Sequence, residues 1–262
     1  MTIEDRLNDL ITAKADMKSA IESKGVEVTG GLSTYADAIR SIEGGGGATL
    51  PVGTKFGYST FTTAPMFDTS GYTEMRSMFY HCDNLTTIPS YNTSNVVSMN
   101  QFAAHCQYLE GLPQLDTSNV LNMAAAFWDC TRLYTIASID TSSVYTMNGT
   151  FAYCYSLYKL PLLDCGNVKD ATEMLRECTV LQEVGGFKDL GKQEDLKTQY
   201  MFKSVSAISH DSLMNIINNL YDRASAGFSS IALQFYPGVL KRLSDEEKAI
   251  ATKKGWALSE SF

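Results

Sequence analysis

Five cysteines recur at one fixed interval along the chain, and regularly spaced thiols could form disulfides, bind zinc or act as nucleophiles. They are Cys82, Cys106, Cys130, Cys154 and Cys178. Equivalent residues of stacked coils lie about 4.8 Å apart, and their parallel Cβ vectors do not suit the torsion angle of a disulfide. No pair has the spacing of zinc ligands. We therefore expect a column of buried, reduced cysteines that pack as small hydrophobic residues.

Two histidines show the same interval. His81 and His105 each precede one of these cysteines, and Asp129 occupies the next position of the series. Imidazoles and a carboxylate in one column could hold a divalent metal ion. Tyr153 follows at the next step, which favours an exposed position where the sequence varies. We expect no metal site and no cofactor.

Candidate catalytic residues are scarce. The chain has no Gly-x-Ser-x-Gly, P-loop, Rossmann or His-Glu-x-x-His motif. Asp116, Asp140 and Asp164 offer carboxylates of the kind that glycoside hydrolases pair. Their regular spacing is better explained by a turn that every repeat uses. The sequence therefore predicts a protein that is not an enzyme.

Binding by a surface is better supported than catalysis. The position after the first leucine of each repeat is aromatic in two neighbouring repeats, at Tyr134 and Tyr158, and Lys159 follows. Tyrosine rings supply large contact areas at low entropic cost. We predict that these three residues form the centre of a binding surface, with Glu110 and Glu183 at its edge.

A second aromatic surface is a rival. Tyr80 and Trp128 share another column of the repeat, and Tyr153 lies near it. Clusters of exposed aromatic residues often mark binding sites. The alternative, which stays open for any single ring, is that these side chains merely cover a hydrophobic layer.

The repeat itself must position these columns. Leu109, Leu112 and Leu115 predict a short strand, and the sequence Asp-Thr-Ser-Asn at 116–119 then offers a helix N-cap. Apolar residues at steps of three, four and three follow, which is typical of one face of a helix. They are Val120, Met123, Phe127 and Cys130. Strand, turn and helix in each unit predict an α/β repeat solenoid with a parallel sheet on one side.

The units resemble the BspA-like leucine-rich repeats of bacterial surface proteins and of bacteriophage tail proteins. The resemblance rests on residues 115–123, Leu-Asp-Thr-Ser-Asn-Val-Leu-Asn-Met, and on the Phe, Cys and Leu columns. With its flanks it extends over residues 50–262. It implies a leucine-rich-repeat fold with 24-residue units, capped at both ends. Residues 13–42 resemble segments that precede varied distal domains in phage tail proteins.

Changes of pattern divide the chain into five parts. Residues 1–43 combine a heptad seam with a second short helical pattern, and four consecutive glycines follow. The expected parts are an N-terminal helical attachment or oligomerisation module (1–43), a Gly-rich linker (44–49), an N-terminal cap (50–66), leucine-rich repeats (67–190) and a C-terminal cap (191–262).

The C-terminal cap has its own local signals. We expect a helix over 211–221, a strand over 231–235 and a return strand over 256–258. Ser244 and Glu247 predict a capping box at the start of a second helix, which Gly255 ends. An insertion at 191–195 interrupts the repeat register.

Charge and hydropathy exclude several partners. The formal net charge is −8 and the pI is near 4.9, which predicts no nucleic-acid or membrane partner. No apolar run reaches the roughly 18 residues of a membrane span. The first residues do not form a Sec-type signal peptide. The resemblance to phage tail proteins implies synthesis in the host cytoplasm and a final location in a virion tail.

These expectations combine into a function. The resemblance implies a phage tail adhesin, in a fibre or at the baseplate tip, that recognises a host cell-surface glycan or protein. Residues 1–43 would bind other virion tail proteins and form a homo-oligomer such as a trimer. A structural or decoration protein of the virion and a bacterial cell-surface adhesin remain as alternatives. A depolymerase fits the location but not the residues.

Overall fold

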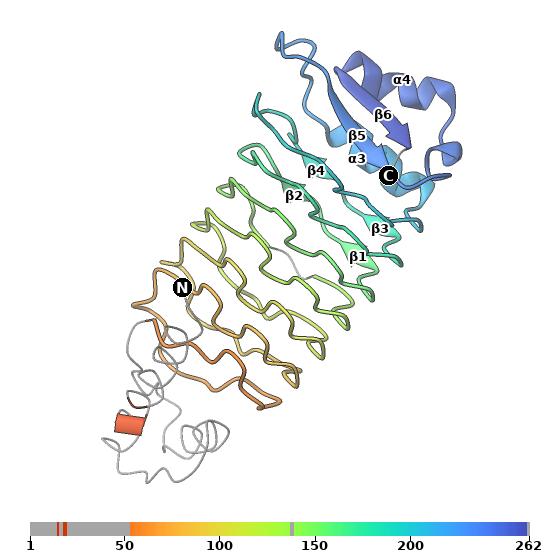
Figure 1. The fold of residues 1–262 in the computed structure, drawn as a ribbon. Helices are drawn as coiled ribbons and strands as arrows, with labels where there is room; N and C mark the ends of the chain where they lie inside the picture. The colour runs from red at the N-terminus through yellow and green to blue at the C-terminus, as the bar shows by residue number, and fades with distance from the viewer. Residues whose placement is uncertain (1–14, 16–17, 20–52, 137–138, 261–262) are drawn as a thin grey trace.

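The computed structural model describes residues 53–136 and 139–260, together with positions 15, 18 and 19. The expected attachment module (1–43) and glycine linker (44–49) thus lie almost entirely outside the described residues. In the described part the chain winds into a stack of similar coils, and a helical cap closes the C-terminal end of the stack (Figure 1). No helix among these residues has the length and apolar character needed to cross a membrane.

Neighbouring coils pair in parallel, and the offset between partners equals the interval of the cysteines. One series of bridges joins Gly111 to Thr135 and Thr135 to Lys159, and a second joins Asn122 to Thr146. Toward the C-terminus the first series continues as one pair of regular strands, and a second pair follows it along each coil. These are β1 (Lys159–Leu160) paired with β3 (Glu183–Val184), and β2 (Leu163–Asp164) paired with β4 (Phe187–Lys188).

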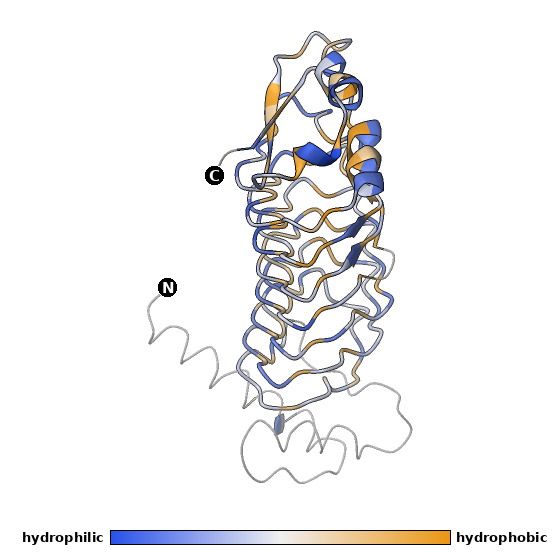
Figure 2. Cartoon of the chain, turned by 90° about the vertical axis from the view of Figure 1, so that its right-hand side faces the viewer, coloured by the Kyte–Doolittle hydropathy of each residue, from blue (hydrophilic) through white to orange (hydrophobic). Residues whose placement is uncertain are grey.

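The cysteine column is buried, as the sequence predicted. All five members are fully buried and their thiols are free. Each thiol donates a hydrogen bond of 3.0–3.2 Å to a backbone carbonyl of the preceding coil. Burial raises the pKa of the Cys130 thiol well above its ordinary range. The column is therefore packed and unreactive, and hydrophobic residues recur at matching places in each coil (Figure 2).

The expected helix over residues 120–130 is wrong, because this segment forms a ladder of tight turns. The N–H groups of Met123, Ala125, Phe127 and Asp129 donate to carbonyls of the next coil. Those of Ala126 and Trp128 donate three residues back, and that of Ala124 donates to Oδ1 of Asn122. Ala125 and Asp129 have φ values of +53° and +58°. A residue with positive φ does not continue an α-helix. The three- and four-residue steps of the apolar positions therefore reflect successive turns.

The Asp-Thr-Ser-Asn segments support turns and do not cap helices. Asp116 Oδ1 accepts hydrogen bonds from the backbone N–H and the hydroxyl of Ser118, at 3.1 and 2.6 Å. Buried Thr117 donates to the carbonyl of Asp140 in the next coil and accepts from its N–H, both at 2.8 Å. The structural role that the sequence assigned to the repeated aspartates is thus confirmed for Asp116.

The insertion near residue 191 is also confirmed. Asp170 pairs with Lys197, whereas an uninterrupted repeat would pair it with Glu194. The ladder then continues to Lys203, past the expected end of the repeats at residue 190.

The C-terminal cap follows the local signals in the sequence. It contains α3 (His210–Asn219), β5 (Ile231–Phe235), the 3-10 helix η1 (Leu240–Arg242), α4 (Asp245–Lys253) and β6 (Trp256–Glu260). Ser244 and Glu247 form the expected capping box at the start of α4. β5 and β6 pair in parallel, and buried Trp256 closes the core at this end.

Candidate recognition surface

The two tyrosines predicted to form the centre of the binding surface lie against each other. The rings of Tyr134 and Tyr158 are parallel, with 5.7 Å between centroids and 5° between planes. Tyr134 is 55% exposed. The two residues occupy equivalent positions of neighbouring coils, and the N–H of Tyr158 donates to the carbonyl of Tyr134 at 2.9 Å. The ladder therefore places the two rings side by side.

The predicted charged residues lie beside this pair. Lys159 in β1 and Glu183 in β3 are register partners, and their side chains form an ion pair with an N–O distance of 2.9 Å. The hydrogen bond to Glu183 raises the pKa of Lys159. Both side chains are about half exposed, so solvent screens the pair and it adds little stability.

Glu110 lies one coil before Tyr134. Its carbonyl accepts a hydrogen bond from the N–H of Tyr134 at 3.3 Å. The next residue, Gly111, faces open space, because a Cβ built there would meet nothing within 4 Å. The five predicted residues thus occupy four consecutive coils of one face, and the structure brings them together.

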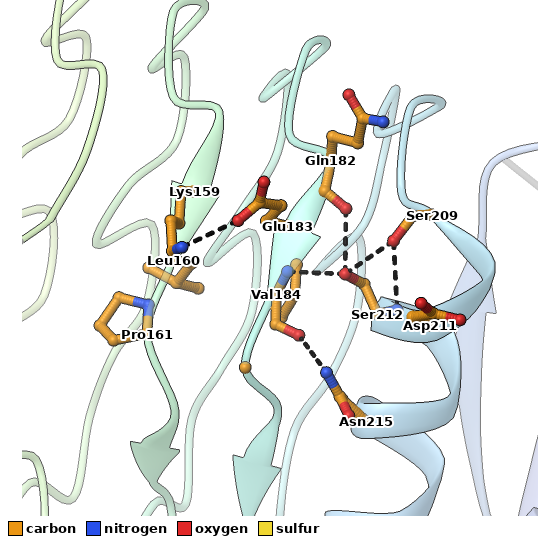
Figure 3. A pocket seen from close by; sticks show the side chains of 11 residues that line it. Lys159, Leu160, Pro161, Gln182, Glu183, Val184, Ser209, Asp211, Ser212 and Asn215 are labelled. Atoms are coloured by element: carbon orange, nitrogen blue, oxygen red, sulfur yellow. Dashed lines mark hydrogen bonds and ion pairs between the residues drawn. The ribbon is translucent and has the colours of Figure 1, made fainter.

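A groove of about 490 Å³ opens next to the ion pair, where the repeats meet the C-terminal cap (Figure 3). The repeats contribute one wall, which includes Lys159 and Glu183, and α3 contributes the other. The residues of the second wall are Ser209, Asp211, Ser212 and Asn215. Sequence reasoning missed this wall, because α3 lies outside the 24-residue repeat and carries no motif that points to the strands it packs on.

Side chains of α3 complete the hydrogen bonds of the strand at the base of the groove. Ser212 Oγ accepts from the N–H of Val184 at 2.8 Å and donates to the carbonyl of Gln182 at 3.0 Å. Asn215 Nδ2 donates to the carbonyl of Val184 at 3.2 Å. The edge of β3 is therefore occupied, so a ligand in the groove would contact side chains rather than extend the sheet.

Arg132 is a further residue that the sequence did not single out. Its guanidinium lies 4.2 Å from the centroid of the Tyr108 ring, which is 43% exposed. These two residues lie two positions before Tyr134 and Glu110, on the outer side of the buried leucines. They extend the polar and aromatic surface toward the turn ladder.

The rival surface is present, and its rings pack against neighbouring rings. Tyr80 lies edge-on to His81 and His105, and Trp128 packs on Tyr153 with 5.0 Å between centroids. Tyr80, Trp128 and Tyr153 are all only partly exposed. Tyr158 in the first surface is likewise partly exposed, so Tyr134 is the most exposed ring of the two sets.

The histidine column has a backbone explanation. The rings of His81 and His105 stack at 4.2 Å, and His105 Nδ1 lies 3.0 Å from Asp129 Oδ2. All three residues have φ between +56° and +65°, and His and Asp are among the residues enriched in that conformation. Within the described part of the chain, no group of three or more His, Cys, Asp or Glu is arranged to hold a metal ion.

Comparison with known families identifies the repeats. A family model described as "Mycoplasma protein of unknown function, DUF285" matches residues 56–156 and again residues 102–215. Together the two matches cover more than half of the chain, and their overlap is expected of a repeated sequence. The chain belongs to this family, which is leucine-rich-repeat-like. No curated protein matches the chain, and no solved structure does.

Proposed function

We propose that the chain is a non-enzymatic adhesin of a bacteriophage tail, in a fibre or at the baseplate tip, whose stacked coils are a leucine-rich-repeat solenoid. Its strand face, which is the side of the stack that carries Tyr134, Tyr158, Lys159 and Glu183, recognises a cell-surface glycan or protein. The tail setting derives from the resemblance of residues 115–123 and 13–42 to segments of phage tail proteins. Tail or baseplate genes beside its own gene would support that setting.

One observation carries the recognition role. Tyr134 is 55% exposed and stacks on the partly exposed Tyr158, and Lys159, the next residue, lines a groove with polar walls. Packing does not explain a tyrosine that is 55% exposed at a position where other repeats have Thr86, Glu110 and Gln182. Central aromatic rings on a preformed surface commonly dominate binding energies.

The test is binding of the fluorescently labelled, full-length chain to a panel of bacterial cells, including wall-less mollicutes, measured by flow cytometry. The double substitution Tyr134→Ala and Tyr158→Ala should weaken binding by roughly tenfold or more, without lowering the melting temperature. Tyr145→Ala is the matched control, because Tyr145 is 45% exposed and belongs to a different column.

Two outcomes would count against the proposal. If the double variant binds normally while Trp128→Ala does not, the rival surface carries recognition. If the unaltered chain binds no cell in the panel, a structural or decoration role in the virion becomes the better explanation.

A further inference from the structure

We infer that the ligand of the strand face is an uncharged oligosaccharide, which lies along the stack from the ring of Tyr134 to the groove beside α3. This inference rests on the proposed function and adds the chemical class of the ligand. It follows from three features: an aromatic platform with open space beside it, a groove whose walls both donate and accept hydrogen bonds, and charges that are already paired.

The platform is the solvent-exposed part of the Tyr134 ring, which is 55% exposed. The Tyr134 ring is stacked on that of Tyr158, which belongs to the next coil toward the groove. Gly111 leaves the space beside the platform open. The C–H face of a sugar ring packs well on a flat aromatic ring, and the phenol hydroxyl keeps a polar partner at its rim.

The groove supplies the hydrogen-bonding partners. Its walls carry the ammonium group of Lys159, the amides of Gln182 and Asn215 and the hydroxyl of Ser209, and Pro161 adds apolar surface. Amides and hydroxyls both donate and accept hydrogen bonds, as sugar hydroxyls do. A groove with this mixture suits a polyol better than an apolar ligand.

The charges argue against a charged ligand. Lys159 is paired with Glu183 at 2.9 Å, and Asp211 lies 3.2 Å from His210. An acidic polymer would meet the carboxylates of Glu183 and Asp211 in a chain whose formal net charge is −8. A cationic ligand would meet the ammonium group of Lys159, which lies in the same wall. An uncharged ligand leaves both pairs intact.

The spacing indicates a ligand longer than one sugar. The coil of Tyr134 and the coil of Glu183 are two steps apart in the ladder, which corresponds to about 10 Å at the usual strand separation. A single ring placed on Tyr134 would not reach the groove, whereas an oligosaccharide along the stack axis contacts both.

The experiment uses the same labelled, full-length chain and the cells that it binds. Cells are treated with periodate, which cleaves the diols of sugars, or with proteinase K, and binding is also measured in about 1 M NaCl, where charge interactions are screened within about 3 Å. We expect periodate to abolish the part of the signal that depends on Tyr134. Proteinase treatment and high salt should leave most of it, and Tyr145→Ala should behave as the unaltered chain under every condition.

The possible failures are distinguishable. Binding that depends on Tyr134 but survives periodate, or disappears with proteinase, identifies a protein ligand and overturns this inference while the adhesin role stands. Binding that is lost at high salt identifies a charged glycan and also overturns it. Absence of any Tyr134-dependent binding overturns the proposed strand-face function together with the inference.

Discussion

Substitutions at one column of the turn ladder should change stability in opposite directions in neighbouring coils. Ala125 has φ +53°, and its equivalent one coil later, Gly149, has φ +58°. A side chain in this conformation costs about 1–2 kcal/mol, whereas glycine avoids that cost but loses about 0.5–1 kcal/mol more conformational entropy on folding. The difference leaves Ala125→Gly more stable than the unaltered chain by about 0.5 kcal/mol.

The reverse change should cost more than this difference alone. A Cβ at Gly149 would lie 2.6 Å from Cε3 and Cζ3 of Trp128, so the indole must move. Trp128 packs on Tyr153 with 5.0 Å between centroids, and a ring pair of this kind contributes about 0.5–1.5 kcal/mol. We therefore expect Gly149→Ala to destabilise by about 1–2 kcal/mol when the backbone cost is included.

Urea unfolding measures both effects, since a shift of the midpoint at constant slope reports stability. Tryptophan fluorescence gives an independent reading, because Trp128 is displaced in Gly149→Ala whereas Trp256, buried in the C-terminal cap, is not. If both substitutions shift the midpoint in the same direction, or if the emission of Gly149→Ala is unchanged, the ladder conformation described for this column is incorrect.

Three further predictions test the packing and the charges. Thr117→Val should destabilise by about 2–3 kcal/mol, because it leaves a backbone N–H and a carbonyl of the next coil without their partner, whereas Thr117→Ser should retain most stability on urea unfolding. Cys130→Ser should cost about 1–3 kcal/mol, and thiol labelling of the native chain should be slow until it unfolds; rapid labelling would contradict a buried column. Hydrogen bonds to Asp211 and Glu247 raise the pKa of His210 above 6.5, so its stabilising contribution is present at lower pH and lost as pH rises through the raised value. The melting temperature of His210→Gln should thus fall below that of the unaltered chain near about pH 6 and match it near about pH 9; an equal difference at both pH values would exclude the ion pair.

Local signals were sufficient for the C-terminal cap. The capping box of Ser244 and Glu247 and the positive φ of Gly255 are encoded within a few residues, so α4 begins and ends where the sequence indicates. The buried cysteine and leucine columns could be predicted for a different reason. A fixed period places equivalent side chains in the same position of every coil, and apolar residues that recur there must face the core.

The turn ladder could not be recognised from apolar spacing. Steps of three and four describe an α-helix, but they also describe successive turns in which alternate N–H groups bond to the next coil. The distinguishing signal was the column of His81, His105 and Asp129, with Gly149 in the other positive-φ column. These residue types favour or tolerate positive φ. The same residues that suggested a metal site therefore report a backbone conformation.

Part of the candidate surface could also be predicted from the sequence, and part could not. Tyr134, Tyr158 and Lys159 could be predicted because variation at an outward column of a repeat is visible in one sequence. The wall formed by Ser209 and Asn215 could not, because it depends on how α3 packs against β3, and the hydrogen bonds of Asn215 and Ser212 to the strand have no periodic signal. A repeat presents a uniform face along its length, whereas a groove requires an interruption of that repetition. The end of the stack, where the cap meets the last strands, is the part of the described chain that combines the Tyr134–Tyr158 pair with a polar groove, and for this reason the proposed binding surface lies there and not along the whole stack of coils.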